Sequence, residues 1–407
     1  MKRSFIIGFC LVLLIVFFVA CNQTVISDEN IGSQYVKGSD DQYNFILYKR
    51  SGGYPIAESE DAVYLLKNSR YLYAVSKKTG DSIPLCNKPD CMHDKTVGVN
   101  SIDNLDCNAC FPVAQDIVYY QGKLYVSVEN SGIYEIDASG TTRRQLLPPQ
   151  KGILRMIVHR GYLYITTSDF IFDWGNHSQE EMKEMACRIE RYRLNPWDGK
   201  PETVYEIKGQ DSQINQMYAY GNRLWFVVNY LKRNQVYIYD MTAHTVTEEP
   251  KEISNGTIIG DRVLVFEVPE GYDDTMSSEE FYQLQEKNMG LIKDFEGNLI
   301  TQTEIPASYE MVCGYSDKIA ADNMFSVISK GVPKEERSVR FYNTEGKLIR
   351  EVKTENDTMP SLGMNEDYFF YMKRGDGDNG DYEIWAIDLH RLDDPDLKGE
   401  PFFVPEE

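Results

Sequence analysis

The sequence predicts an all-β protein folded as a single β-propeller, with seven four-stranded blades as the best count. The main observation is a unit of 40 to 62 residues that recurs along the chain, with four short β-rich runs separated by turns. Repeats of this length and pattern are typical of propeller blades. The 28 Tyr and 18 Phe residues agree with this fold, because aromatic side chains fill the wedges between neighbouring sheets. A closed ring also protects sheet edges that an open array would expose.

The second repeat is the clearest copy of the unit. It reads Asp116-Ile-Val-Tyr-Tyr, a Gln-Gly turn, Lys123-Leu-Tyr-Val-Ser-Val, a run from Gly132 to Asp137 and a closing strand through Leu147. The related units begin near Tyr54, Asp116, Met156, Ile214, Gly256, Lys318 and Gly363. Seven units predict seven blades, and the weak turn signals of the sixth unit leave six or eight blades as alternatives.

Both ends of the chain offer a strand for closing the ring. One candidate is residues 43–48, Tyr-Asn-Phe-Ile-Leu-Tyr, and the other is residues 401–405, Pro-Phe-Phe-Val-Pro. We expect one of these segments to pair beside the blade at the opposite terminus. Such pairing would join the first and last blades through backbone hydrogen bonds.

Two long insertions interrupt the connection from the second to the third strand of a unit, over 168–186 in the third unit and 269–288 in the fifth. Each carries a helix-start pattern, Ser178-Gln-Glu-Glu181 and Ser277-Ser-Glu-Glu280, in which the hydroxyl caps backbone amides and the Glu reaches back. Connections of this class leave a propeller on the same face as those between blades. The sequence therefore predicts short helical insertions in two blades, either as a shaped binding rim or as loops tolerated at the surface.

The N-terminus predicts export and lipid attachment. Lys2 and Arg3 precede an apolar run from Phe5 to Phe18, and Val19-Ala20-Cys21 follows it. These are the parts of a signal peptide, and the run is too short for an ordinary membrane span. The position of Cys21 resembles the acylated cysteine of bacterial lipoproteins, so we expect attachment to the extracytoplasmic face of the cell membrane. The chain then divides into a signal peptide (1–20), a polar lipid-anchored tether (21–43) and the propeller (44–407).

The sharpest chemical signal lies between the first and second units. It consists of Cys86, Cys91, His93, Cys107 and Cys110. Thiolates and imidazole are preferred ligands of tetrahedral Zn²⁺, and the first four residues would complete a Cys₃His set, with Cys110 as a substitute for His93 or a spare. A closed set predicts a structural zinc rather than a catalytic one. Disulfide bonds are the main alternative, because an exported protein can meet oxidants and four cysteines are an even number, and free thiols are the third.

At this cluster the chain resembles a group of uncharacterised TolB-like propeller lipoproteins from anaerobic Gram-positive bacteria. The matching residues are Leu85-Cys86, Pro89-Asp90-Cys91, His93 and Asp106-Cys107-Asn108-Ala109. An aromatic residue often follows the Asn-Ala pair in that group, whereas this chain has Cys110. The resemblance implies a propeller fold and a lipoprotein location, and it implies no reaction.

A weaker candidate site lies near the C-terminus. Asp376, Asp378 and Asp381 belong to a Gly-rich loop that could wrap Ca²⁺. Their spacing differs from the helix-loop-helix calcium motif, and an Asp-Asn-Gly hairpin turn needs the same residues. We therefore favour a plain turn at this position.

Composition and motifs direct the functional hypothesis toward binding. The formal net charge of −21 repels phosphate backbones, so we do not expect nucleic acid as a partner. The sequence contains no Gly-x-Ser-x-Gly, His-Glu-x-x-His or phosphate-binding glycine motif. We expect a monomeric, non-catalytic binding module that presents one propeller face to a protein, peptide or glycan. The alternative is an extracellular propeller enzyme, a glycan lyase or hydrolase with acid and base residues at the channel mouth.

Overall fold

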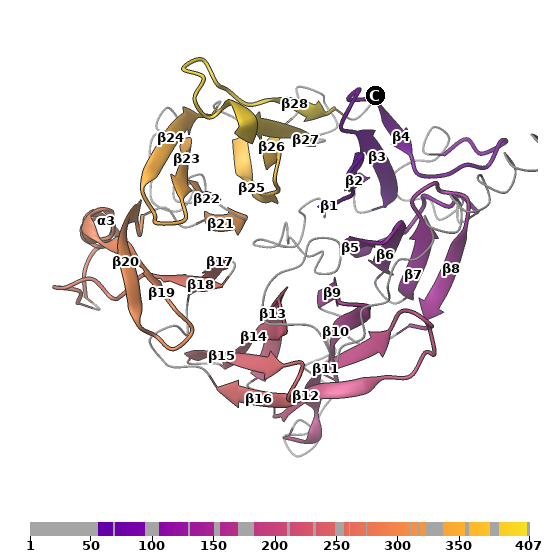
Figure 1. Cartoon of the computed structure of the whole chain (residues 1–407), viewed down its shortest axis with the longest axis horizontal. Coiled ribbons are helices and arrows are strands. Elements are labelled where there is room, and N and C mark those ends of the chain that lie inside the picture. The colour runs from indigo at the N-terminus through magenta and orange to yellow at the C-terminus, as the bar shows by residue number, and fades with distance from the viewer. Residues whose placement is uncertain are drawn as a thin grey trace, which may run out of the picture.

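The computed structural model of the chain is a ring of seven four-stranded antiparallel sheets, which confirms the predicted seven-bladed propeller (Figure 1). Each sheet takes four consecutive strands, and the strand order across the sheet follows the chain. The first strand of each blade lies nearest the centre of the ring, and the fourth lies outside. The structure describes residues 56–67, 70–93, 106–128, 131–149, 155–169, 183–209, 212–230, 233–248, 256–259, 261–273, 275–308, 311–315, 318–322, 337–354, 358–374 and 382–404.

The first four blades are formed by the strands β1 to β16, four per blade in chain order. The first contains β1 (Ile56–Glu58), β2 (Ala62–Lys67), β3 (Tyr71–Ser76) and β4 (Ser82–Pro84). The second contains β5 (Ala114–Tyr120), β6 (Lys123–Val128), β7 (Gly132–Asp137) and β8 (Arg143–Leu147). The third contains β9 (Arg155–His159), β10 (Tyr162–Ser168), β11 (Ala186–Arg193) and β12 (Glu202–Lys208). The fourth contains β13 (Ser212–Tyr220), β14 (Arg223–Tyr230), β15 (Arg233–Asp240) and β16 (Thr245–Glu248).

The last three blades complete the ring, and they contain an α-helix in the fifth blade and a short 3₁₀ helix in the seventh. The fifth contains β17 (Thr257–Ile259), β18 (Arg262–Val265), helix α3 (Ser278–Lys287), β19 (Met289–Lys293) and β20 (Leu299–Pro306). The sixth contains β21 (Met311–Tyr315), β22 (Lys318–Asp322), β23 (Ser338–Asn343) and β24 (Leu348–Lys353). The seventh contains β25 (Thr358–Met364), β26 (Tyr368–Arg374), β27 (Tyr382–Asp388), the short 3₁₀ helix η4 (Leu389–Arg391) and β28 (Glu400–Phe403).

Burial falls from the middle of a blade to its outer edge. Every residue of β10 is buried, because neighbouring blades cover both faces of the sheet. The outer strand β12 of the same blade has no buried residue. Middle strands therefore read as nearly continuous apolar or aromatic runs, while outer strands are polar. This gradient explains why Leu-Tyr pairs occur in the middle strands β3, β6 and β10.

One of the two predicted helical insertions is confirmed in atomic detail. Helix α3 begins after Ser277, whose hydroxyl accepts from the amide of Glu280, while the Glu280 carboxylate accepts from the amide of Ser277. This reciprocal pair is the capping box that the sequence predicted. The other predicted helix start, at Ser178, lies outside the described residues. Among the residues that are described, no helix is long and apolar enough to cross a bilayer.

The expected pairing of residues 401–405 with the first blade is wrong. The strand β28 pairs with β27 and forms the outer edge of its own blade. The other candidate, 43–48, lies outside the described residues. In the described part of the chain, every sheet draws its four strands from one continuous segment.

Side-chain packing closes the ring between the first and seventh blades. The rings of Tyr73 and Phe403 meet edge to face, with centroids 5.3 Å apart. The ammonium group of Lys77 lies 3.0 Å from the carboxylate of Glu58 and 3.1 Å from that of Asp367. Apolar residues of the first, second and seventh blades share one cluster at this junction. Burial of apolar surface can therefore replace the hydrogen bonds of a shared strand.

Candidate metal centre

The segment between β4 and β5 leaves the first blade and then returns to complete its edge. Where β4 ends, the amide of Leu85 donates to the carbonyl of Leu72 at 2.8 Å. After the excursion, the carbonyl of Ala109 accepts from the amide of Leu72 at 2.9 Å. The amide of Phe111 donates to the carbonyl of Arg70 at 2.7 Å. The departing arm (residues 85–93) and the returning arm (residues 106–113) therefore share one edge of β3.

The returning arm is buried between the first two blades. Four of its residues expose 1% or less of their surface: Cys107, Ala109, Cys110 and Phe111. The side-chain amide of Asn108 donates to the carbonyls of Gly140 and Thr141 at 2.9 and 3.0 Å. Because Gly140 and Thr141 belong to the β7–β8 turn, these bonds join the arm to the second blade.

Arg143 supports the returning arm from the same blade. One nitrogen of its guanidinium donates to the carbonyls of Cys107 and Cys110, each at 2.8 Å. The guanidinium also lies over the rings of Phe111 and Tyr134, at 5.2 and 5.5 Å from their centroids. A charged donor thus satisfies two carbonyls of an irregular, buried segment. No local pattern in the sequence points to Arg143, since it follows Cys107 by 36 residues.

The turn at Gly140 allows the departing arm to approach the second blade closely. The amide of Asn87 donates to the Gly140 carbonyl at 3.1 Å. Gly140 has φ +72°, and a Cβ at this position would lie 2.7 Å from the carbonyl carbon of Leu85. Only glycine fits both conditions without strain. The same turn is capped by Asp137, whose carboxylate accepts from the amide of Thr141 at 3.0 Å.

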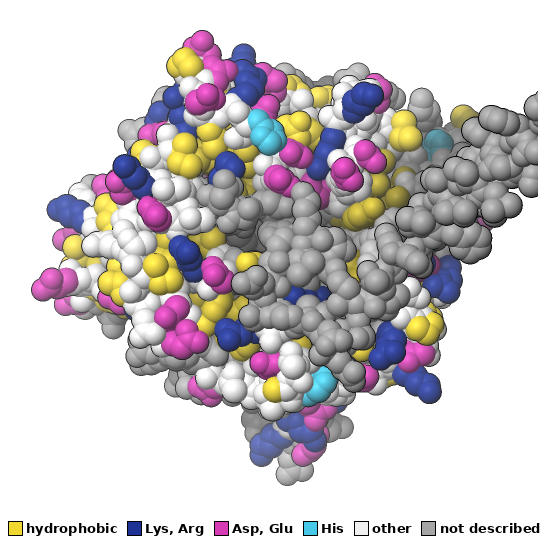
Figure 2. Space-filling view, in the orientation of Figure 1, with side chains coloured by type: hydrophobic (Ala, Val, Ile, Leu, Met, Phe, Trp, Pro, Cys, Tyr) yellow, Lys and Arg dark blue, Asp and Glu magenta, His cyan; other side chains and the backbone are white. Residues whose placement is uncertain are grey.

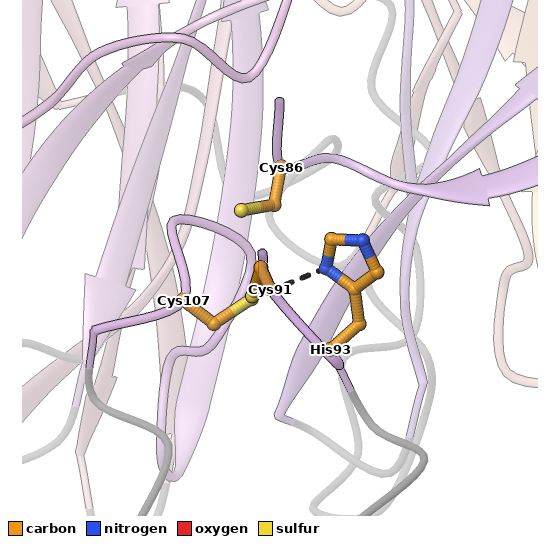
Figure 3. Close-up of side chains that lie close together, drawn as sticks. All are labelled: Cys86, Cys91, His93 and Cys107. Atoms are coloured by element: carbon orange, nitrogen blue, oxygen red, sulfur yellow. Dashed lines mark hydrogen bonds between the residues drawn. The ribbon is translucent and has the colours of Figure 1, made fainter. Parts of the chain in front are cut away.

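The two arms bring together four of the five predicted ligands. The Sγ atoms of Cys86, Cys91 and Cys107 and a ring nitrogen of His93 all lie within 4.8 Å of one another (Figure 3). The Nδ1 atom of His93 is 3.7 Å from the Sγ atom of Cys107. In a tetrahedral zinc site, bond lengths of about 2.3 Å to sulfur and about 2.0 Å to nitrogen separate these two atoms by about 3.5 Å. The group could therefore hold a metal ion after a small contraction.

Local backbone geometry turns the departing arm toward the group. The amide of Cys91 donates to the carbonyl of Lys88 at 3.2 Å, which closes a turn between Cys86 and Cys91. His93 has φ +54°, a left-handed conformation that is uncommon for a residue with a side chain. In this conformation its imidazole points toward Cys107 (Figure 3). Strained backbone at a cluster of ligand side chains is typical of functional sites.

Cys86 and Cys107 have pKa values shifted in opposite directions. Burial alone would raise the pKa of Cys86, but hydrogen bonds from the amides of Lys88 and Asn108 and from neighbouring thiols outweigh it and lower the pKa. Burial raises the pKa of Cys107 well above its usual value, and the sulfurs of Cys91 and Cys86 raise it further. A negative charge is therefore easier to place on Cys86 than on Cys107, and repulsion between neighbouring thiolates opposes a second charge. A bound divalent cation would remove that repulsion.

Cys110 lies apart from this group. Its amide donates to the carbonyl of Cys107 at 3.1 Å, and Cys110 also forms an isolated bridge with Tyr71 of β3. The residue thus serves as part of the buried edge of the first blade. None of the six cysteines that the structure describes forms a disulfide: Cys86, Cys91, Cys107, Cys110, Cys187 and Cys313.

The other four predicted site residues lie outside the described residues: Cys21, Asp376, Asp378 and Asp381. Within the described ranges, the Cys86 group is the only set of three or more His, Cys, Asp or Glu side chains close enough to share a metal. The described histidines outside it have other partners: the ring of His159 bonds the Gly221 carbonyl, that of His244 the Tyr239 hydroxyl and that of His390 the Asp367 carboxylate.

Exposed apolar side chains on the connecting segments favour one face of the ring. Met92 and Val113 lie between β4 and β5, and Val268 and Tyr272 lie between β18 and β19, with 44% to 75% of each residue exposed. Both connections leave from the same end of the antiparallel blades. The described turns at the opposite end contain no exposed large apolar side chain, but Leu299 and Leu348 begin outer strands directly after two of those turns. The exposed apolar residues on outer strands are Ile83, Leu299, Ile300, Leu348 and Ile349. On the face seen in Figure 2, acidic and basic side chains are scattered among apolar ones.

Comparisons with known proteins support the fold and nothing finer. No family model matches the chain, and no curated protein matches its sequence. A solved prolyl endopeptidase is similar over 87% of this chain and 50% of its own, with TM-score 0.53 and 14% identity. The β-propeller domain of a protease from Pyrococcus furiosus gives TM-score 0.48 and 10% identity over 72% of this chain and 85% of its own. TolB from Acinetobacter baumannii gives TM-score 0.38 and 13% identity over 70% of this chain and 61% of its own.

Proposed function

We propose that this protein is an extracytoplasmic lipoprotein whose propeller acts as a non-catalytic binding module. Lipid on Cys21 would anchor it to the cell membrane, and residues 21–43 would tether the propeller. The ligand would be a protein, peptide or glycan that docks on one face of the ring. The signal peptide pattern supports the location, and the fold supports the binding role.

The observation that carries the binding role is a set of exposed apolar side chains on the connecting segments of one face: Met92, Val113, Val268 and Tyr272. Single exposed apolar residues are ordinary on protein surfaces. Here those on connecting segments occur at the face that also carries α3 and the loop between β4 and β5. A docking face needs accessible apolar surface together with irregular loops that shape it.

We further propose that Cys86, Cys91, His93 and Cys107 hold a structural Zn²⁺. Three thiolates and one imidazole are a ligand set that zinc prefers, and four protein ligands leave no open coordination position. The chemistry supplied by the ion would be cross-linking alone. Three ligands come from the departing arm and one from the returning arm, so the ion would fasten the loop to the first blade.

The location is tested by replacing the proposed lipid-bearing residue. Cys21→Ser should abolish acylation. The variant should then be released into the medium or accumulate as the precursor with its signal peptide uncleaved. Intact mass of the wild-type protein should show a diacylglyceryl-modified Cys21 as the first residue. An unmodified mature chain in the membrane fraction would contradict the proposal.

The binding face is tested by matched charge substitutions on opposite faces. Val268→Asp combined with Tyr272→Asp places charges on the proposed docking face, while Ala243→Asp places one in the β15–β16 turn opposite. Cross-linking on intact cells, followed by mass spectrometry, should identify a partner for the wild type and for Ala243→Asp. The double variant should lose it by at least about tenfold, as expected for loss of buried apolar contacts. Equal capture by all three proteins would refute the assignment of the face.

A further inference from the structure

The four proposed zinc ligands differ in their access to solvent. Cys86 and Cys91 are half-buried on the departing arm. The other described cysteines expose 5% or less of their surface: Cys107, Cys110, Cys187 and Cys313. An oxidant in solution would therefore meet the first two sulfurs before any other described thiol.

We propose that Cys86 and Cys91 form a redox-sensitive pair that releases the metal when a peroxide oxidises them. This proposal rests on the proposed zinc site and adds its regulation. The two Sγ atoms lie within 4.8 Å of each other, as do all ligand atoms of the group. They are separated by one short turn, closed by the bond from the Cys91 amide to Lys88. A disulfide, with a bond of about 2.05 Å, needs only movement within this arm.

The chemistry balances with hydrogen peroxide as the oxidant. One thiolate attacks a peroxide oxygen, breaks the O–O bond and becomes a sulfenic acid, while the other oxygen leaves as hydroxide. The second thiolate attacks the sulfenic sulfur, forms the S–S bond and expels a second hydroxide. The pair of sulfurs loses two electrons, and the peroxide gains them. Two protons from solvent convert the hydroxides to water.

Loss of these two thiolates would remove the metal cross-link between the two arms. His93 and Cys107 would remain, and two ligands cannot hold a structural zinc at a closed site. The new disulfide would close only the departing arm, because Cys86 and Cys91 both belong to it (Figure 3). The edge formed by Ala109 and Phe111 would then depend on its hydrogen bonds and burial alone. Zinc and disulfide, the two hypotheses drawn from the sequence, become two states of one loop.

The experiment is a peroxide titration of the full mature chain, purified with a reducing dithiol and desalted without oxygen. Zinc is followed with a chromogenic chelator, and the product is digested with a protease that cleaves before aspartate. This digestion separates Cys86, in peptide 81–89, from Cys91, in peptide 90–93. We expect one zinc released per chain with a single equivalent of peroxide, and peptides 81–89 and 90–93 joined by a disulfide. Dithiol and added zinc should restore the starting state.

The controls separate this proposal from the zinc site itself. Cys110→Ser, which removes a buried thiol outside the group, should release zinc at the same rate as the wild type. Zinc that stays bound under a tenfold excess of peroxide would overturn the redox proposal and leave the zinc site intact. A disulfide that involves Cys107 would also overturn it. A reduced chain that contains no zinc would overturn the site and the redox proposal together.

Discussion

The substitution Cys107→Ser tests the proposed zinc clamp most directly. Cys107 is the only member of the group on the returning arm, so its loss separates the two arms completely. Cys110→Ser is the matched control, because Cys110 lies three residues away, is equally buried and stands outside the group. Both variants place a hydroxyl in the same apolar region, and only one of them removes a ligand.

The expected difference follows from the length of the clamped loop. Cross-linking a loop of about 15 residues stabilises a fold by about 3 kcal/mol, mainly by restricting the unfolded chain. The segment from Cys91 to Cys107 is of this length. The cost of burying a hydroxyl is common to the two variants and cancels in the comparison. With zinc present, Cys107→Ser should therefore be less stable than Cys110→Ser by about 3 kcal/mol.

The assay is urea unfolding followed by tryptophan fluorescence, with and without a strong chelator. Chelation should lower the stability of the wild type and of Cys110→Ser, and leave Cys107→Ser nearly unchanged. After chelation the two variants should have similar stability, since neither retains the cross-link. Equal stability of the two variants in the presence of zinc, within about 1 kcal/mol, would refute the clamp.

Three further predictions concern the backbone and the ring junction. Val113 has φ +58°, a conformation that is strained for a β-branched residue, and its side chain is exposed. Val113→Gly should therefore raise the free energy of unfolding in urea by about 1 kcal/mol. A lower free energy of unfolding would contradict this reasoning. Gly140→Ala would place a Cβ 2.7 Å from the Leu85 carbonyl carbon. Calorimetry should therefore show a clearly lower Tm for this variant. An unchanged Tm would contradict the close approach of the two segments. Burial would raise the pKa of Asp367, but hydrogen bonds from His390 and Lys77 outweigh it and lower the pKa. The stability from Asp367 should therefore be present above its ordinary pKa and fade as the pH falls through the lowered value. Melting curves of Asp367→Asn should show a weaker decline in acid than wild type, and parallel declines would exclude this contribution.

The second blade shows why much of the fold was predictable. The runs read from the sequence coincide closely with β5 to β8, and the Gln-Gly turn lies between β5 and β6. Gln121 and Gly122 both have positive φ, as a tight hairpin requires. The capping box at Ser277 was equally visible, since its partner Glu280 is only three residues away. Each of these features depends on neighbours in the chain.

The sequence by itself determined the blade repeat, the hairpin turns, helix α3 and the small set of residues that can bind a metal. All of these arise from alternation, turn chemistry and ligand spacing over short distances along the chain. Only the tertiary structure decided that Cys110 stands outside the metal group and that Arg143 and Gly140 hold the loop. It also decided that Lys77 and Asp367, 290 residues apart, help to close the ring. These contacts depend on how neighbouring blades pack, and no local pattern of residues records that packing.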